Sequence, residues 1–214
     1  MTKPILSAVV GTNAELIAEV ARLYLKPGMS VIDLTYGRGV FWKTADLWGI
    51  ELTKCDIAPQ FQDVHRQDFT NLSGTLYDDD TYDVAVFDPP YMHGQGAKGA
   101  KSTIKASIAD CYKNNDADQA PMNHTRIMAD YYEPGMREAA RVVKPGGQVW
   151  VKCKDEIEAG KQRWSHREVY EIAEKLGLKA KDLFMLVQTT TPAMRQEVQH
   201  HARKNHSILW VFEK

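Results

Sequence analysis

The hydrophobic positions along the chain follow a helical period in some segments and form short continuous runs in others. After Asn13, apolar side chains recur at helical spacing over residues 14–25 until Lys26-Pro27-Gly28 interrupts them, which predicts a capped helix with a defined end. The apolar run at 82–87 is of the kind buried at the centre of a sheet. Further helices are expected at 41–48, 126–143 and 166–176, and further strands at 30–34, 51–57, 64–69, 148–153, 183–187 and 208–212.

This order of elements favours an α/β fold, a doubly wound, Rossmann-like and mostly parallel sheet with helices on both faces. No repeat of solenoid length is visible. With 214 residues, 43% of them hydrophobic and 26% charged, the chain has the size and composition of one globular domain spanning 1–214. The apolar run at 5–10 is too short for a membrane span or a signal-peptide core, so we expect a cytoplasmic protein.

Two long polar intervals separate the expected elements. Residues 92–125 are rich in glycine and lysine, and connections of this length are usually functional or disordered. Within them, Gly99-Ala100-Lys101-Ser102 departs from the Gly-Lys-Ser/Thr of a phosphate-binding loop. The net charge of −1 provides no overall positive field, so a polyanionic partner would be held by a local patch. The most basic stretch is 188–207, with Arg195, His200, His201, Arg203, Lys204 and His206.

The cysteines and histidines indicate neither disulfides nor a metal. Cys55, Cys111 and Cys153 are odd in number and widely spaced, which is typical of reduced thiols, and two of them fall in expected strands. His200, His201 and His206 match no zinc-binding spacing, and no metal is expected. His93 is interpreted as a solvent-facing loop residue.

The first candidate site follows the strand expected at 30–34. Asp33 closes this strand, and Gly37 and Gly39 follow in a turn where the backbone can approach a ligand and a following helix would offer unpaired N–H groups. Asp56 ends the next strand, where a carboxylate can accept from two ribose hydroxyls. Because glycine pairs also serve plain turns, the two aspartates strengthen the interpretation.

The second candidate site is Asp88-Pro89-Pro90-Tyr91, directly after the most apolar strand. The Asp88 carboxylate and the Pro89 carbonyl would both face the crevice in which open α/β sheets bind ligands. Two acceptors suit an exocyclic amine, because holding both N–H groups stabilises the positive charge that develops on nitrogen during methyl transfer. If this amine belongs to a nucleobase, Tyr91 would stack on the ring of that base. The alternative is a strand-ending turn with Tyr91 in the core.

At these residues the sequence resembles the class I S-adenosylmethionine-dependent amino-methyltransferases, in particular the adenine-N6/cytosine-N4 DNA methyltransferases. The segment 33–39 is similar to the family's Asp-Pro-Phe-x-Gly-x-Gly loop, although Leu34 and Thr35 replace Pro-Phe. The residues 88–91 match the catalytic motif in its adenine-typical form, and the end of the chain from Asn205 to Phe212 resembles the family's closing antiparallel strand. The resemblance implies catalytic roles for Asp88, Pro89, Pro90 and Tyr91, and cofactor contacts for Thr12, Asn13, Asp33, Thr35, Gly37, Gly39, Asp56, Ile57, Asp68, Phe69 and Asp88.

The resemblance further implies a seven-stranded sheet, S-adenosylmethionine as cofactor and a nucleic acid as partner, with direct methyl transfer to adenine N6 in DNA favoured. RNA adenine N6 or guanine N2 is the nearest alternative, and a non-catalytic cofactor-binding subunit is another. A small-molecule or protein methyltransferase has no need of a paired-acceptor clamp. We expect no separate target-recognition domain, so recognition would fall to 92–125, to 159–166 with Arg163 and Trp164, and to 188–207.

Overall fold

The computed structural model describes residues 4–72, 77–90, 123–189 and 198–214 of the chain. Its strands are β1 (Ala8–Val10), β2 (Ser30–Asp33), β3 (Glu51–Asp56), β4 (His65–Arg66), β5 (Tyr82–Phe87), β6 (Val143–Cys153), β7 (Glu156–Glu158), β8 (Lys161–Arg163), β9 (Lys179–Val187) and β10 (His206–Glu213). Its helices are α1 (Asn13–Tyr24), the one-turn 3-10 helix η1 (Val40–Trp42), α3 (His124–Ile127), the π-helical turn η3 (Met128–Tyr132), α4 (Glu133–Val142) and α5 (Ser165–Lys175).

Among the described residues, eight strands form one sheet in the order β1-β9-β10-β6-β5-β2-β3-β4, and β7 and β8 form a separate hairpin. Neighbouring strands are parallel except at β10, which is antiparallel to both β6 and β9. The mostly parallel α/β architecture and the antiparallel last strand are therefore confirmed. The expected count of seven is wrong, because β1 adds an eighth strand that pairs with β9 from Ala8↔Met185 to Val10↔Val187.

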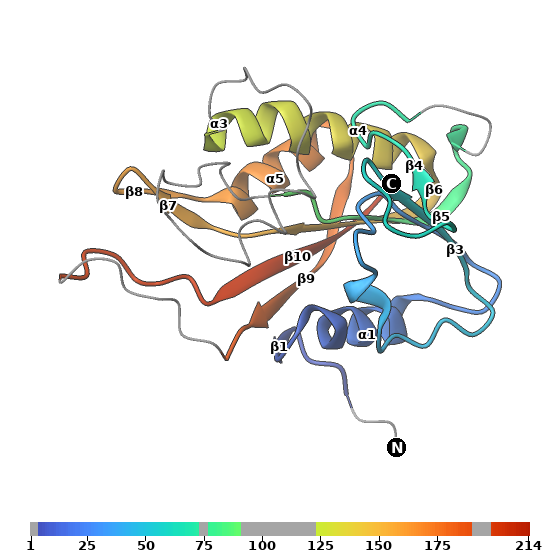
Figure 1. Ribbon diagram of the computed structural model, residues 1–214, viewed down its shortest axis with the longest axis horizontal. Helices are drawn as coiled ribbons and strands as arrows, with labels where there is room; N and C mark the ends of the chain where they lie inside the picture. The colour runs from blue at the N-terminus through green and yellow to red at the C-terminus, as the bar shows by residue number, and fades with distance from the viewer. Residues whose placement is uncertain (1–3, 73–76, 91–122, 190–197) are drawn as a thin grey trace.

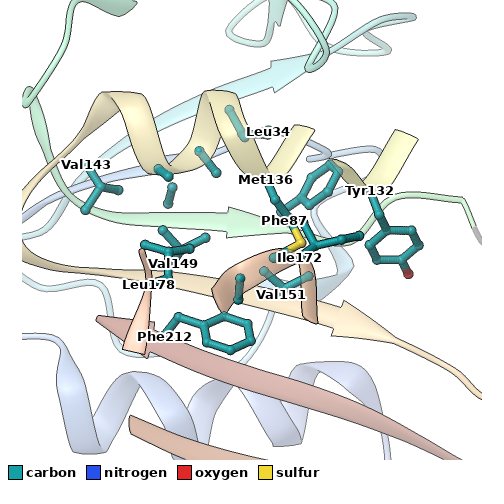
Figure 2. Close-up of a cluster of buried hydrophobic side chains, with 14 of the residues drawn as sticks. Leu34, Phe87, Tyr132, Met136, Val143, Val149, Val151, Ile172, Leu178 and Phe212 are labelled. Atoms are coloured by element: carbon teal, nitrogen blue, oxygen red, sulfur yellow. The ribbon is translucent and has the colours of Figure 1, made fainter. Parts of the chain in front are cut away.

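Helices cover both faces of the sheet (Figure 1). On one face α4 and α5 enclose the larger core, where Phe87, Met136 and Ile172 meet between sheet and helices (Figure 2). On the other face α1 and η1 pack over Trp150 and other strand residues. Side chains along β5 alternate between these two cores, so both faces of this central strand are buried, as its continuous apolar run predicts.

The helix expected at 41–48 is the largest local error of the sequence prediction. Only Val40–Trp42 is helical, and it forms a single 3-10 turn that begins at Gly39 in a left-handed conformation. The Trp42 indole N–H donates to Asp33 Oδ2 at 2.7 Å, and Asp46 Oδ1 accepts from the Trp48 N–H at 3.0 Å. These contacts hold the segment in turns. The loop after β2 is therefore not followed by an α-helix whose dipole could assist a ligand.

Other elements differ from expectation mainly in extent. The expected strand at 64–69 is reduced to β4, whereas β6 and β9 begin earlier than expected, at Val143 and Lys179. The expected loop at 159–166 is replaced by the end of the β7–β8 hairpin and the start of α5. The helix expected at 126–143 is present but contains η3, which places Tyr131 against Phe69 and Tyr132 against Phe87.

Cys55 and Cys153 are buried thiols in or at the end of strands, as predicted, and Cys111 lies outside the described residues. No helix in the described part of the chain is both long enough and apolar enough to span a bilayer.

Candidate active site

Three predicted site residues meet where neighbouring parallel strands end. Asp33 ends β2, Asp56 ends β3, and Asp88 follows β5, and β2 lies between β3 and β5 in the sheet. The chain leaves β2 toward β3 on one side, while β5 lies on its other side. This is the switch point at whose carboxyl edge open α/β sheets bind ligands.

Asp33 is almost fully buried, with 2% of its surface exposed. Its Oδ1 accepts from the Thr35 N–H at 2.9 Å, and its Oδ2 accepts from the Trp42 indole. The pKa of Asp33 is raised to about 7, mainly by burial and to a smaller extent by the nearby carboxylates of Asp88 and Asp56, while its two hydrogen bonds oppose the shift. This acid therefore changes its charge near neutral pH.

The raised pKa of Asp33 predicts how stability depends on pH. From about pH 4 to about pH 7 the native state keeps a proton that the unfolded state has lost, so the free energy of unfolding falls as pH rises across this window. Between pH 5 and pH 8 the free energy of unfolding of the wild-type protein should fall by roughly 2–4 kcal/mol. Asp33→Asn should abolish this fall, as measured by urea unfolding without ligand. Equal pH dependence in wild type and variant would contradict the prediction, and Asp63→Asn, at an exposed carboxylate, is the control.

Thr35 joins the two sequence motifs. Its hydroxyl accepts from the Asp88 backbone N–H at 2.8 Å, while its own N–H is bound to Asp33. The Pro-Phe of the motif that this segment resembles has no hydroxyl to do this. Thr35 thus couples the loop after β2 to the loop after β5. Leu34, the other residue that differs from the motif, is buried in the core with 1% of its surface exposed.

The loop after β2 also holds Asp56 in place. The Gly37 N–H donates to Asp56 Oδ2 and the Ala58 N–H to Oδ1, each at 2.8 Å. Gly37 and Gly39 have φ values of +53° and +66°, in the left-handed region. A Cβ on Gly39 would lie 2.6 Å from the Tyr36 hydroxyl oxygen. Because a carboxylate oxygen has two acceptor positions, Asp56 retains acceptor capacity for further hydroxyls.

The segment predicted to contact an adenine ring lies beside the same edge. Phe69 packs edge-on against Phe87, the residue before Asp88, with the two ring centroids 5.1 Å apart. Asp68 is exposed and accepts from the Thr70 N–H and hydroxyl, and the Ile57 carbonyl accepts from Arg66 Nε at 3.2 Å. Phe69 is therefore positioned near the other motifs, whereas the Asp68 carboxylate shapes its own turn.

Asp88 combines burial with unused acceptor capacity. Its Oδ1 is buried and has no hydrogen-bond partner within the described ranges. Lys152 Nζ lies 3.8 Å from this oxygen, an ion-pair distance that is too long for a hydrogen bond. Burial raises the pKa of Asp88, and Lys152 opposes this shift. Pro89 is buried and Pro90 is half-buried, whereas Tyr91, His93 and the predicted loop up to residue 122 lie outside the described residues.

Lys152 is a site residue that the sequence prediction missed. It lies on β6 with only 1% of its side chain exposed, and its ammonium is 5.9 Å from the centre of the Phe41 ring. The signal was in the sequence, since a lysine interrupts the apolar strand 148–153. Lysines are almost never fully buried unless they are paired.

Thr12 and Asn13 lie at the same edge of the sheet, after β1. Thr12 caps α1, because its hydroxyl accepts from the Glu15 N–H at 3.3 Å and the Glu15 side chain bonds back to the Thr12 N–H at 2.7 Å. Asn13 Oδ1 is buried without a hydrogen-bond partner in the described part of the chain. Thr12 thus has a structural role, while Asn13 keeps an acceptor unused.

Comparison with solved structures defines the class of fold. The chain is similar to a TehB-like S-adenosylmethionine-dependent methyltransferase from Corynebacterium glutamicum, with a TM-score of 0.51 and 15% identity over 94% of this chain and 86% of that chain. It is also similar to the 1,6-didemethyltoxoflavin-N1-methyltransferase of Burkholderia thailandensis, solved with bound 1,6-didemethyltoxoflavin and S-adenosylhomocysteine, with a TM-score of 0.52 and 13% identity over 95% and 78% of the two chains.

A third similar structure is a possible exported protein from Bordetella parapertussis, with a TM-score of 0.54 and 13% identity over 94% of this chain; the chain spans 66% of that protein's length. No protein-family model and no curated protein sequence matches the chain. The chain therefore has the Rossmann-like fold of class I S-adenosylmethionine-dependent methyltransferases, and the likeness is one of fold.

Proposed function

We propose that the protein transfers a methyl group from S-adenosylmethionine to the exocyclic amine of a nucleobase, with adenine N6 in DNA as the favoured target. The observation that carries this proposal is the buried Asp88 Oδ1, which has no hydrogen-bond partner among the described residues and lies at the carboxyl edge of the central strand. Such an acceptor costs free energy unless a ligand donates to it.

The residues at this edge fit the cofactor. Asp56, fixed by the Gly37 and Ala58 N–H groups, is suited to accept from the ribose hydroxyls, and Phe69 offers an apolar surface for the adenine ring. Asn13 Oδ1 and the Asp33 carboxylate are acceptors for the amino group at the methionine end. When bound, S-adenosylmethionine supplies an electrophilic methyl group on a sulfonium.

The chain would act on the target amine by position and charge. Asp88 and the Pro89 carbonyl would each accept one N–H of the amine, which favours a tetrahedral nitrogen and stabilises the positive charge that it acquires. Consecutive prolines restrict the backbone after Asp88 and so keep both acceptors in place. A base in a duplex would have to be flipped out at a cost of a few kcal/mol, and Tyr91 is assigned the stacking contact that offsets it.

The described parts of two segments predicted to contact nucleic acid, 159–166 and 198–207, come together at this edge of the sheet. The β7–β8 hairpin and the segment before β10 project beyond the same edge (Figure 1). Between them, Lys204 Nζ lies 5.5 Å from the centre of the Trp164 ring, and Trp164 is 50% exposed. An exposed aromatic ring beside a cation can stack on a base and neutralise a phosphate.

Trp164→Ala should therefore weaken DNA binding about tenfold, and Lys204→Ala should reduce the salt dependence of binding by about one phosphate contact. Fluorescence anisotropy with a labelled oligonucleotide measures both effects. Trp48→Ala is the matched control, since Trp48 is 77% exposed but precedes β3 at the opposite edge. An equal effect of the two tryptophan variants would contradict a contact specific to Trp164.

The function itself is tested with tritiated S-adenosylmethionine and a panel of double-stranded DNA, single-stranded DNA and RNA, followed by digestion to nucleosides. Label in N6-methyldeoxyadenosine is the expected result. Label in RNA adenosine or guanosine would show that RNA is the substrate for the same chemistry. If the protein binds the cofactor but labels none of the three, the catalytic proposal is wrong and a non-catalytic partner subunit becomes the better interpretation.

A further inference from the structure

The contact between Lys152 and Asp88 is the only ion pair in the described part of the chain that joins a fully buried lysine to a predicted catalytic residue. Lys152 lies on β6, next to β5 in the sheet, where Phe87 pairs with Val151. Lys152 and Asp88 each come one residue after this pair, so the sheet register brings their backbones side by side.

The surroundings of Asp88 make a nearby positive charge important. Asp33, hydrogen-bonded through Thr35 to the Asp88 backbone, adds negative charge beside it when ionised, and Asp56 lies one strand further on. Cys153 and Lys154 directly follow Lys152 in the chain. Burial raises the pKa of the Cys153 thiol, which the Lys152 ammonium opposes, whereas burial and then the Lys152 ammonium lower the pKa of Lys154. Among the described groups whose charges are coupled to Asp88, Lys152 alone has an ammonium within ion-pair distance of its carboxylate.

The protonation state of Asp88 decides what it can do to an amine. A carboxylate accepts hydrogen bonds with both oxygens, whereas a protonated carboxyl group presents an O–H donor that would compete with the amine N–H groups. Burial among other acids favours the protonated form, and an opposite charge within about 4–6 Å favours the carboxylate.

We propose that Lys152 is a positioning residue that keeps Asp88 ionised, so that the carboxylate acts as an acceptor for the target amine. This inference deepens the proposed function and rests on it for its kinetic consequence, but the state of Asp88 can be measured without turnover. Lys152 touches neither the cofactor nor the base in this assignment, and acts through Asp88.

The primary experiment is a pH titration of the ligand-free protein labelled with ¹³C at the aspartate carboxyl groups. The Asp88 signal is assigned by its loss in Asp88→Asn. In Lys152→Met, its midpoint should move to higher pH by about one to three units, whereas Lys152→Arg should keep it near the wild-type value. An unmoved Asp88 midpoint in Lys152→Met would overturn the proposal even if the enzyme is active.

Kinetics then provide a second, separate readout. The acidic limb of the kcat–pH profile should shift upward by the same amount in Lys152→Met, with near-normal KM for the cofactor and with rescue by Lys152→Arg. A uniform loss of kcat at every pH would indicate a merely structural role and overturn the inference. If wild-type protein methylates nothing in the panel, the proposed function fails, while the carboxyl titration still decides the role of Lys152.

The double variant Asp88→Asn/Lys152→Met is the control for the case in which Lys152→Met fails to fold, because it removes both charges of the pair at once. If Lys152→Met is unfolded and the double variant is folded, the two residues depend on each other and the pairing is supported. If the double variant is also unfolded, Lys152 is required for the fold regardless of Asp88, and the proposal is overturned.

Discussion

Asp88→Ala is expected to lower kcat for methyl transfer by about 10²–10³-fold or more, while the Kd for S-adenosylmethionine changes little. The variant removes the buried Oδ1 that we assign to the target amine, but leaves Thr35, Asp33 and the Gly37 turn in place. Single-turnover assays measure the chemical step, and isothermal titration calorimetry measures cofactor binding in the same preparation.

Asp83→Ala is the control on the same strand. Asp83 lies near the amino end of β5, where it accepts from the Ser30 N–H and from Lys144 Nζ, both at 2.8 Å. Its loss should reduce stability without a comparable effect on kcat. Near-normal turnover by Asp88→Ala would show that the acceptor role is wrong.

Asp56→Ala should have its main effect on cofactor binding, raising the Kd for S-adenosylmethionine by about 10–100-fold. The carboxylate is held by two backbone N–H groups and is assigned to the ribose hydroxyls, and hydrogen bonds to a charged group are worth about 1.5–3 kcal/mol each. At saturating cofactor much of kcat should return, which separates this variant from Asp88→Ala.

The matched control is Asp63→Ala, on the connection between β3 and β4. Asp63 is 66% exposed and pairs with Lys54, so its removal should leave the Kd unchanged. An unchanged Kd in a folded Asp56→Ala protein would remove Asp56 from the cofactor site, and the milder Asp56→Asn, which retains one acceptor oxygen, would then be expected to behave like wild type.

The central strands and the positions of the motifs were predictable because they depend on local patterns. Strand patterns that end at or just before Asp33, Asp56 and Asp88 predict neighbouring parallel strands with acids at one edge, and the structure brings these acids together. The helix expected at 41–48 failed because the decisive contact is tertiary. The buried Asp33 carboxylate accepts a hydrogen bond from the Trp42 indole N–H, and the helix ends after one turn.

Pairing between distant segments was equally beyond the sequence pattern. Nothing local in the apolar run at 5–10 indicates that Ala8–Val10 pairs with Met185–Val187. The role of Thr35 was hidden for a related reason: it appeared as a departure from a motif, and its bond to the Asp88 N–H is visible only once β2 and β5 are neighbours.

The π-helical turn η3 sets the phase of the helical segment in which it lies. Deleting one residue from η3 would restore regular α-helix and rotate the turn that starts at His124 by about 100° relative to α4. His124 would then leave Glu156 and Glu168, which its ring nitrogens contact at 3.1 and 2.8 Å. The extra residue thus allows α4 to keep its register against β5 while the preceding turn faces the β7–β8 hairpin and α5.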